Sequence, residues 1–194
     1  MSVALLSAVP AGNAGEEAVM LIRIWRFPTL VLTALLAGMT FCHVLEMPAK
    51  LQYSAWLYLA LHRTLYVAFG PPNIGVFVEM GAILSSAVLI LLVRRRAGFW
   101  PTLIGAGCLL MGLLTYFAQV EPANAALKMM AVEAPPENWT LWRDQWEYGH
   151  ALHFLFDFLG FCSLAWSVLL PSPTVADGPT RPVPTSRTER TPSS

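Results

Sequence analysis

The sequence has few charged residues and few cysteines for its length. Only 12% of its 194 residues are Asp, Glu, Lys or Arg, whereas 56% are hydrophobic. This balance is typical of a protein in lipid rather than in water. The formal net charge of +0 gives no reason to expect a nucleic-acid partner. Cys42, Cys108 and Cys162 stand far apart in apolar sequence, without the paired spacing of a zinc site or a redox dithiol.

Long apolar runs predict the fold. A membrane-spanning helix needs about 20 mostly apolar residues, and such runs occur at 27–44, 74–93, 97–118 and 149–170. We predict an all-α polytopic membrane protein over residues 21–170, with the spans in an antiparallel four-helix transmembrane bundle. Residues 51–69 are apolar on one helical face but carry a glutamine, a histidine and an arginine. This pattern favours an interfacial helix after the first span.

The distribution of basic residues predicts the topology. With four spans, Arg23, Arg26, Arg94, Arg95, Arg96, Arg181, Arg187 and Arg190 fall on one side, and Lys50, Arg63, Lys128 and Arg143 fall on the other. Because basic loops stay inside, both termini are predicted to be cytoplasmic, with the protein in a bacterial inner (plasma) membrane. Residues 1–20 are predicted to be a flexible tail, with Met20 as an alternative start. Residues 171–194, rich in Pro, Ser and Thr, are predicted to be disordered.

Three glycines repeat at intervals of seven on the third apolar run, at Gly98, Gly105 and Gly112. Residues at this spacing share a helical face, and small residues let membrane helices approach closely. We therefore predict a packing seam rather than a chemical role.

The last apolar run opens with a polar stripe. At about 100° per residue on an α-helix, His150, His153 and Asp157 share one face, with Glu147 at its edge. An ionisable group within a span costs roughly 2.5–3.5 kcal/mol on insertion scales, so several on one face indicate a function.

Two other runs place ionisable groups at the same level. His43, Glu46 and Lys50 share a face at the outer end of the first run, and Glu79 lies about 10 Å below the outer end of the second. We predict a polar pocket in the outer half of the bundle, with pocket residues Glu79, Lys50, Trp142, Trp146, His153 and Asp157. The tryptophans also fit an aromatic belt at the membrane surface.

Several chemistries fit these residues. Imidazoles beside carboxylates act as general bases. The Glu147-x-x-His150 spacing also occurs in carboxylate-bridged metal bundles, which leaves a divalent metal on His43, Glu147, His150 and His153, or a haem between histidines, as an open alternative. A further interpretation is a transporter that uses Glu79 and Asp157 as a proton relay. The non-catalytic alternative is a pocket that binds a lipid or a partner.

Three short motifs resemble the anthrone oxygenase-like family of small membrane proteins. They are His43-Val44-Leu45-Glu46-Met47-Pro48-Ala49-Lys50, then Glu79, then Trp142-Arg143-x-x-Trp146-Glu147-x-x-His150-Ala151. The resemblance covers roughly residues 27–170.

The resemblance implies oxidation of a lipophilic aromatic small molecule, anthrone- or quinol-like, by oxygen, without a metal or flavin cofactor. By that resemblance, His150 with Glu147 would be the base and its orienter, and His43 with Glu46 the alternative pair. Arg143 or Lys50 would stabilise an enolate-like oxygen, while Trp and Phe side chains would line the substrate slot. The oligomeric state stays open.

Overall fold

The computed structural model describes residues 12–66, 69 and 73–170, and within these ranges it is all-α without a strand. Its elements in chain order are α1 (Gly12–Lys50), α2 (Ala55–Thr64), α3 (Ile74–Val93), α4 (Phe99–Thr115), the π-helical turn η2 (Tyr116–Val120), α5 (Glu121–Met129) and α6 (Trp139–Leu169). The predicted tails at 1–11 and 171–194, and residues 67–68 and 70–72 of the predicted interfacial segment, lie outside the described residues.

Four helical stretches in the described residues are long and apolar enough to cross a membrane: Gly15–Lys50, Ile74–Val93, Phe99–Met129 and Trp139–Leu169. This confirms the four predicted spans. Large hydrophobic side chains remain exposed along them, including Phe27, Phe77 and Leu91, as expected for surfaces in contact with lipid tails. The chain is therefore assigned as an integral membrane protein.

The helices extend beyond the predicted runs. Residues 12–20, expected in a flexible tail, are helical, because this stretch holds good helix formers such as Glu16 and Glu17. The third span continues through η2 and α5 to Met129, although residues after 118 are too polar to be recognised as part of an apolar run. In the segment 51–69 the α-helix covers Ala55–Thr64, and the Ser54 side chain caps its first turn by accepting from the Leu57 amide.

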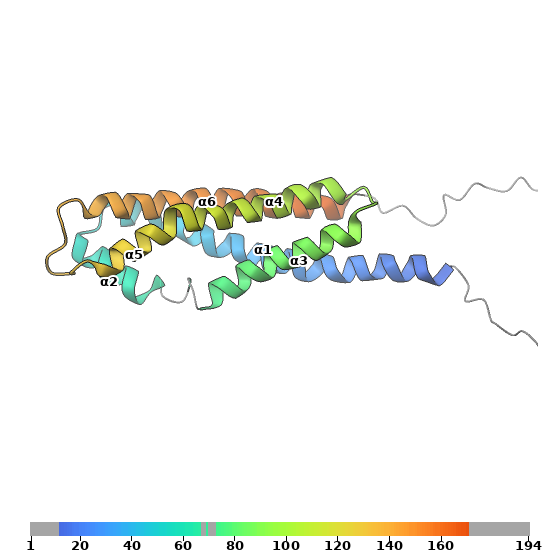
Figure 1. Cartoon of the computed structure of the whole chain (residues 1–194), viewed down its shortest axis with the longest axis horizontal. Coiled ribbons are helices and arrows are strands. Elements are labelled where there is room, and N and C mark those ends of the chain that lie inside the picture. Colours follow the sequence, from blue (N-terminus) through green and yellow to red (C-terminus); the bar gives the residue numbers. More distant parts are fainter. Residues whose placement is uncertain (1–11, 67–68, 70–72, 171–194) are drawn as a thin grey trace, which may run out of the picture.

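The long helices lie side by side and alternate in direction along the chain (Figure 1). α6 packs against both α4 and α1, and α3 packs against α1 and α4. At one end of the bundle, here called the α2 end, α2 lies against α5, and a loop leads into α6. The opposite end, here called the arginine end, carries the turn 94–98 between α3 and α4 and the last turn of α6.

Glycines let α4 and α6 approach closely. A Cβ at Gly105 would come 2.7 Å from the Leu164 side chain and 3.0 Å from the Gly160 carbonyl oxygen. Gly98 and Gly112 face α6 in the same way, so the seam predicted from the seven-residue repeat is confirmed.

A second close approach joins α3 to the segment after α2. A Cβ at Gly75 would come 1.6 Å from the Phe69 carbonyl oxygen, so only glycine fits at this position. The contact brings the Phe69 backbone onto the start of α3, beside the cavity described below.

An aromatic and aliphatic cluster holds the α2 end together. The side chains of Tyr58 and Leu59 on α2 pack with those of Ala123 and Leu127 on α5 and Trp146 on α6, and all five are buried. Burial of this apolar surface holds α2 against α5 and α6 at the α2 end of the bundle. The cluster thereby positions the polar side chains that point from α2, α5 and α6 towards the bundle interior.

Candidate functional site

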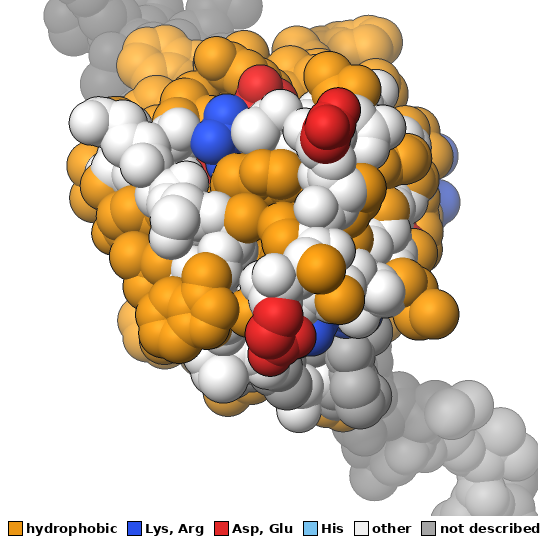
Figure 2. Space-filling model, turned by 90° about the vertical axis from the view of Figure 1, so that its left-hand side faces the viewer, with side chains coloured by type: hydrophobic (Ala, Val, Ile, Leu, Met, Phe, Trp, Pro, Cys, Tyr) orange, Lys and Arg blue, Asp and Glu red, His pale blue; other side chains and the backbone are white. Residues whose placement is uncertain are grey.

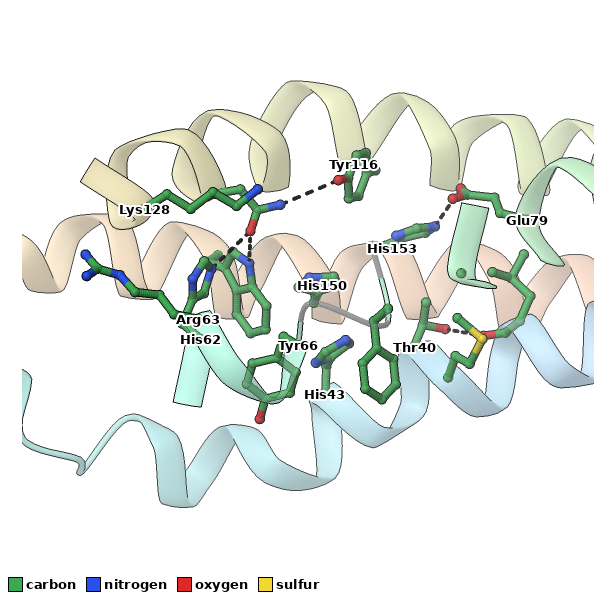
Figure 3. Close-up of a pocket in the computed structure, with 16 residues that line it drawn as sticks. Thr40, His43, His62, Arg63, Tyr66, Glu79, Tyr116, Lys128, His150 and His153 are labelled. Atoms are coloured by element: carbon green, nitrogen blue, oxygen red, sulfur yellow. Dashed lines mark hydrogen bonds and ion pairs between the residues drawn. The ribbon is translucent and has the colours of Figure 1, made fainter. Parts of the chain in front are cut away.

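A cavity of ≈ 210 Å³ lies inside the bundle towards the α2 end. All four histidines of the sequence line it, namely His43, His62, His150 and His153 (Figure 3). The rest of its wall is formed by Leu36, Met39, Thr40, Arg63, Tyr66, Phe69, Gly75, Glu79, Tyr116, Asn124, Lys128 and Trp146. No histidine is visible on the end face of the molecule in Figure 2, which agrees with the burial of all four rings.

His43 on α1 and His150 on α6 stack in the middle of the cavity wall. Their ring centroids are 4.1 Å apart with an interplanar angle of 28°. The edge of the Trp146 ring packs against both, with centroid distances of 5.0 Å to His43 and 4.3 Å to His150. Nδ1 of each imidazole is buried and has no hydrogen-bond partner among the residues that the structure describes. Among the described residues, the two imidazoles are therefore not paired with a carboxylate.

His153 lies deeper in the bundle, between two carboxylates. Its Nε2 is 3.2 Å from Glu79 Oε1 on α3 and 3.3 Å from Asp157 Oδ2 one turn further along α6. The Thr40 hydroxyl on α1 donates to the same Asp157 oxygen at 3.1 Å. Gly112 on α4 makes room for this group, because a Cβ there would lie 2.7 Å from Asp157 Oδ1. Four helices thus enclose a cluster that can hold or pass on a proton.

Asn124 organises the opposite end of the cavity. Its Oδ1 accepts from the Trp146 indole at 2.7 Å and lies 3.1 Å from His62 Nε2. Burial lowers the pKa of His62 to about 4, and the contact with Asn124 offsets this only in part. At neutral pH His62 is therefore uncharged, and its Nε2–H donates to Asn124.

A buried ion pair that is not part of the cavity lining packs against Trp146. Lys50 Nζ is 3.1 Å from Glu147 Oε2 and 4.5 Å from the centroid of the Trp146 ring. The Tyr58 hydroxyl donates to Glu147 Oε1 at 3.0 Å. Burial, together with the negative charge of Glu147, raises the pKa of the Tyr58 phenol above its usual range. Tyr58 therefore keeps its proton and stays a hydrogen-bond donor. This network fixes the wall of the cavity without facing into it.

Tyr66 connects the cavity wall to the more exposed Glu46. Its hydroxyl donates to Glu46 Oε2 at 2.6 Å, and Lys50 Nζ lies 3.6 Å from the same oxygen. Burial and the hydrogen bond to Glu46 raise the pKa of the Tyr66 phenol above its usual range. The carboxylate of Glu46 is therefore a partner of Tyr66 and Lys50, not of His43.

The predicted site residues fall into three groups. His43, Glu79, Trp146, His150 and His153 line the cavity. Lys50, Glu46, Glu147 and Asp157 lie behind the lining residues, held by the contacts given above. Arg143 and Trp142 are not among the lining residues.

Arg143 instead binds groups around the start of α6. Its Nη1 donates to the Leu51 carbonyl at 2.8 Å, and its Nη2 lies 2.8 Å from Asp144. Its guanidinium also lies over the Trp139 ring at 5.1 Å, and Trp142 packs against the cluster at the α2 end. The guanidinium of Arg143 is therefore bound by the loop at Leu51 and lies outside the lining of the cavity.

The residues of the alternative metal site do not form a set of metal ligands. Among the described residues, no group of three or more His, Cys, Asp or Glu side chains is placed to hold a metal ion. Imidazole binds a metal through an in-plane lone pair, whereas His43 and His150 meet face to face. Glu147, the expected carboxylate ligand, is engaged by Lys50 and Tyr58.

Several lining residues did not enter the prediction, notably Arg63, Tyr66, Tyr116, Asn124 and Lys128, and His62 was expected only in an interfacial helix. The π-helical turn η2, where Tyr116 lies, interrupts the α-helix of the third span, and such turns are often found at functional sites. The amphipathic spacing of residues 121–129 is the signal that would have indicated Asn124 and Lys128.

The chain matches no protein-family model, no curated protein and no solved structure.

Proposed function

We propose that the cavity binds a small, flat, lipophilic aromatic and that the His43–His150 pair removes a proton from it, so that oxygen oxidises the resulting anion. The observation that carries this proposal is the stacked pair itself. Two imidazoles line an aromatic cavity within a membrane domain, and Nδ1 of each has no partner among the described residues. Such nitrogens are suited to general-base catalysis.

The polarity of the cavity supports this class of ligand. Aromatic side chains form its middle, whereas polar groups stand at its two ends, with His153 and Glu79 at one and His62 and Asn124 at the other. A flat ring system with oxygen substituents at opposite edges matches this arrangement. A cavity of about 150 Å³ holds benzene, so ≈ 210 Å³ suits a ring system somewhat larger than benzene. A three-ring anthrone would place its central ring, with the reacting methylene, in the cavity and extend beyond it with an outer ring.

The proposed reaction balances without a bound cofactor. A C–H bond of a methylene between aromatic rings breaks, its proton passes to His150 or His43, and its electron pair is delocalised over the rings. The anion gives one electron to dioxygen, and the radical and superoxide combine to a peroxide anion, which takes the proton back from the imidazolium and becomes a hydroperoxide. The same imidazole then removes the second C–H proton as the O–O bond breaks, and the departing hydroxide takes that proton to become water. The sum is that CH₂ and O₂ become C=O and H₂O.

An oxygen anion on the substrate needs a cationic or donating partner. The resemblance assigns this role to Arg143 or Lys50, but both are engaged elsewhere. Lys128 lines the cavity, and in Figure 3 its side chain extends along α5 towards Tyr116. We therefore assign the role to Lys128.

The test is oxygen uptake by membranes that carry the native chain, with anthrone or a substituted hydroquinone as substrate. His150→Ala is expected to lower the protein-dependent rate by about 10²–10⁴-fold. The control Cys162→Ala changes an exposed thiol away from the lining residues and should keep the native rate. Equal uptake by native protein and His150→Ala would refute the catalytic proposal. Saturable binding of the aromatic without oxygen uptake would support the non-catalytic alternative, a pocket that only binds.

We also propose that the arginine end faces the cytoplasm, which places the cavity in the outer half of the membrane. Accessibility labelling of a single cysteine introduced at Arg95, in a chain with the three native cysteines replaced, tests this. Labelling of intact cells by an impermeant reagent would contradict it.

A further inference from the structure

Arg26 on α1 is a buried cation at the arginine end. Its side chain is only 8% exposed. Nη2 donates to the Ser167 carbonyl in the last turn of α6 at 3.0 Å, where helix carbonyls lack intrahelical partners. Nε is buried and has no hydrogen-bond partner in the described part of the chain. Nη2 of the guanidinium therefore has a hydrogen-bond acceptor, whereas Nε has none among the described residues.

The first turn of α4 adds donors beside this guanidinium. Gly98 is the N-cap of α4 and provides no side-chain cap. A Cβ at Gly98 would come 3.0 Å from Arg26 Nη2, so the glycine makes room for the guanidinium at the start of the helix. The N-terminus of a helix and an arginine side chain both favour an anion, phosphate in particular.

The positive charges around Arg26 have no ion-pair partner among the residues that the structure describes. Arg23 and Arg96 lie close enough for their positive charges to act on it. None of the ion pairs among the described residues involves Arg23, Arg26 or Arg96. A buried charge without a counter-charge is strongly destabilising, so this end of the bundle favours an anion that the described residues do not supply.

We infer that Arg26, with Arg23, Arg96 and the first turn of α4, binds the headgroup phosphate of an anionic phospholipid. A lipid is favoured over free phosphate because large apolar side chains are exposed at the same end of the bundle. Trp100 and Trp166, at the start of α4 and near the end of α6, are 67% and 58% exposed. Exposed tryptophans of this kind mark the headgroup level, and basic pockets between membrane helices bind lipid phosphates. The inference is independent of the cavity.

The experiment compares lipids on the purified full chain in a non-ionic detergent. Phosphatidylglycerol, phosphatidylcholine or inorganic phosphate is added, thermal unfolding is followed, and native mass spectrometry counts retained lipid. Phosphatidylglycerol at saturating concentration is expected to raise the melting temperature by about 5 °C, and phosphatidylcholine should not. Arg26→Gln should lose the shift. Arg95→Gln removes the same charge from an exposed position of the turn 94–98 and should retain the shift.

Three results would overturn the inference: an equal shift with both lipids, a full shift in Arg26→Gln, or a full shift with inorganic phosphate alone. If Arg26→Gln does not yield folded protein, the native chain still decides. Preferential retention of phosphatidylglycerol over phosphatidylcholine by the native chain supports the site, and equal retention contradicts it.

Discussion

Removing Lys50 should destabilise the α2 end more than almost any other single charge change. Lys50 is 2% exposed and its partner Glu147 is 1% exposed, with Nζ and Oε2 3.1 Å apart. In Lys50→Met the lysine stem is replaced by a chain of similar shape, and the carboxylate of Glu147 stays buried with only the Tyr58 hydroxyl as a donor. The perturbation therefore isolates the missing positive charge.

The expected loss is large because the remaining charge is uncompensated. Breaking a buried ion pair by removing one partner costs about 3–5 kcal/mol. At about 2–4 °C per kcal/mol for a domain of this size, the melting temperature should fall by roughly 6–20 °C. Lys50→Met/Glu147→Gln removes both charges and should be more stable than Lys50→Met alone, since the uncompensated carboxylate is gone.

The assay is thermal unfolding of purified variants in one detergent, followed by tryptophan fluorescence. Lys128→Met is the matched control, because Lys128 is exposed and forms none of the ion pairs among the described residues, so a shift near zero is expected. An unchanged melting temperature in Lys50→Met would refute the reasoning. So would a double variant whose loss equals the sum of the two single losses, since the coupling between the two charges would then be absent.

Two further predictions concern packing and pH. Gly112→Ala should cost about 1–3 kcal/mol through overpacking, because its Cβ would lie 2.7 Å from Asp157 Oδ1. Gly107→Ala, whose Cβ meets no described atom within 4 Å, should leave the melting temperature unchanged or slightly raised. Because burial lowers the pKa of His62 from its ordinary value of 6.5 to about 4, the unfolded chain binds more protons between these two pH values. Stability should then fall as pH drops from 6.5 to 4, by at most about 3 kcal/mol. His62→Leu should remove this part of the pH dependence, and an identical profile in this variant would contradict the assignment.

Hydropathy and helical periodicity predict much of this fold because spans must be long and apolar to cross lipid. The same logic identified Glu79, His150 and His153, since ionisable groups within apolar helices are costly and rarely incidental. Spacing on one helix also placed Asp157 beside His153, and the two side chains do meet at 3.3 Å.

Long-range contacts set the limit of prediction from sequence. Arg143 lies one turn before Glu147 on α6, but its guanidinium binds the Leu51 carbonyl, 92 residues away in the chain. Asn124 and Lys128 follow the third apolar run in a stretch too polar for a span, and α5 is stabilised by packing against α6 and α2. The contact of Arg143 leaves no periodic signal in the sequence, and the packing of α5 is indicated only by the amphipathic spacing of residues 121–129.

The central claim, that the stacked imidazoles act as a base, is tested most directly by hydrogen–deuterium exchange of anthrone without oxygen. The native chain in D₂O should accelerate exchange of the methylene protons above the rate in empty membranes, because proton removal precedes the reaction with oxygen. His43→Ala/His150→Ala should fall to the background rate, while Cys162→Ala keeps the native rate. Exchange as fast in the double variant as in the native chain would contradict the account.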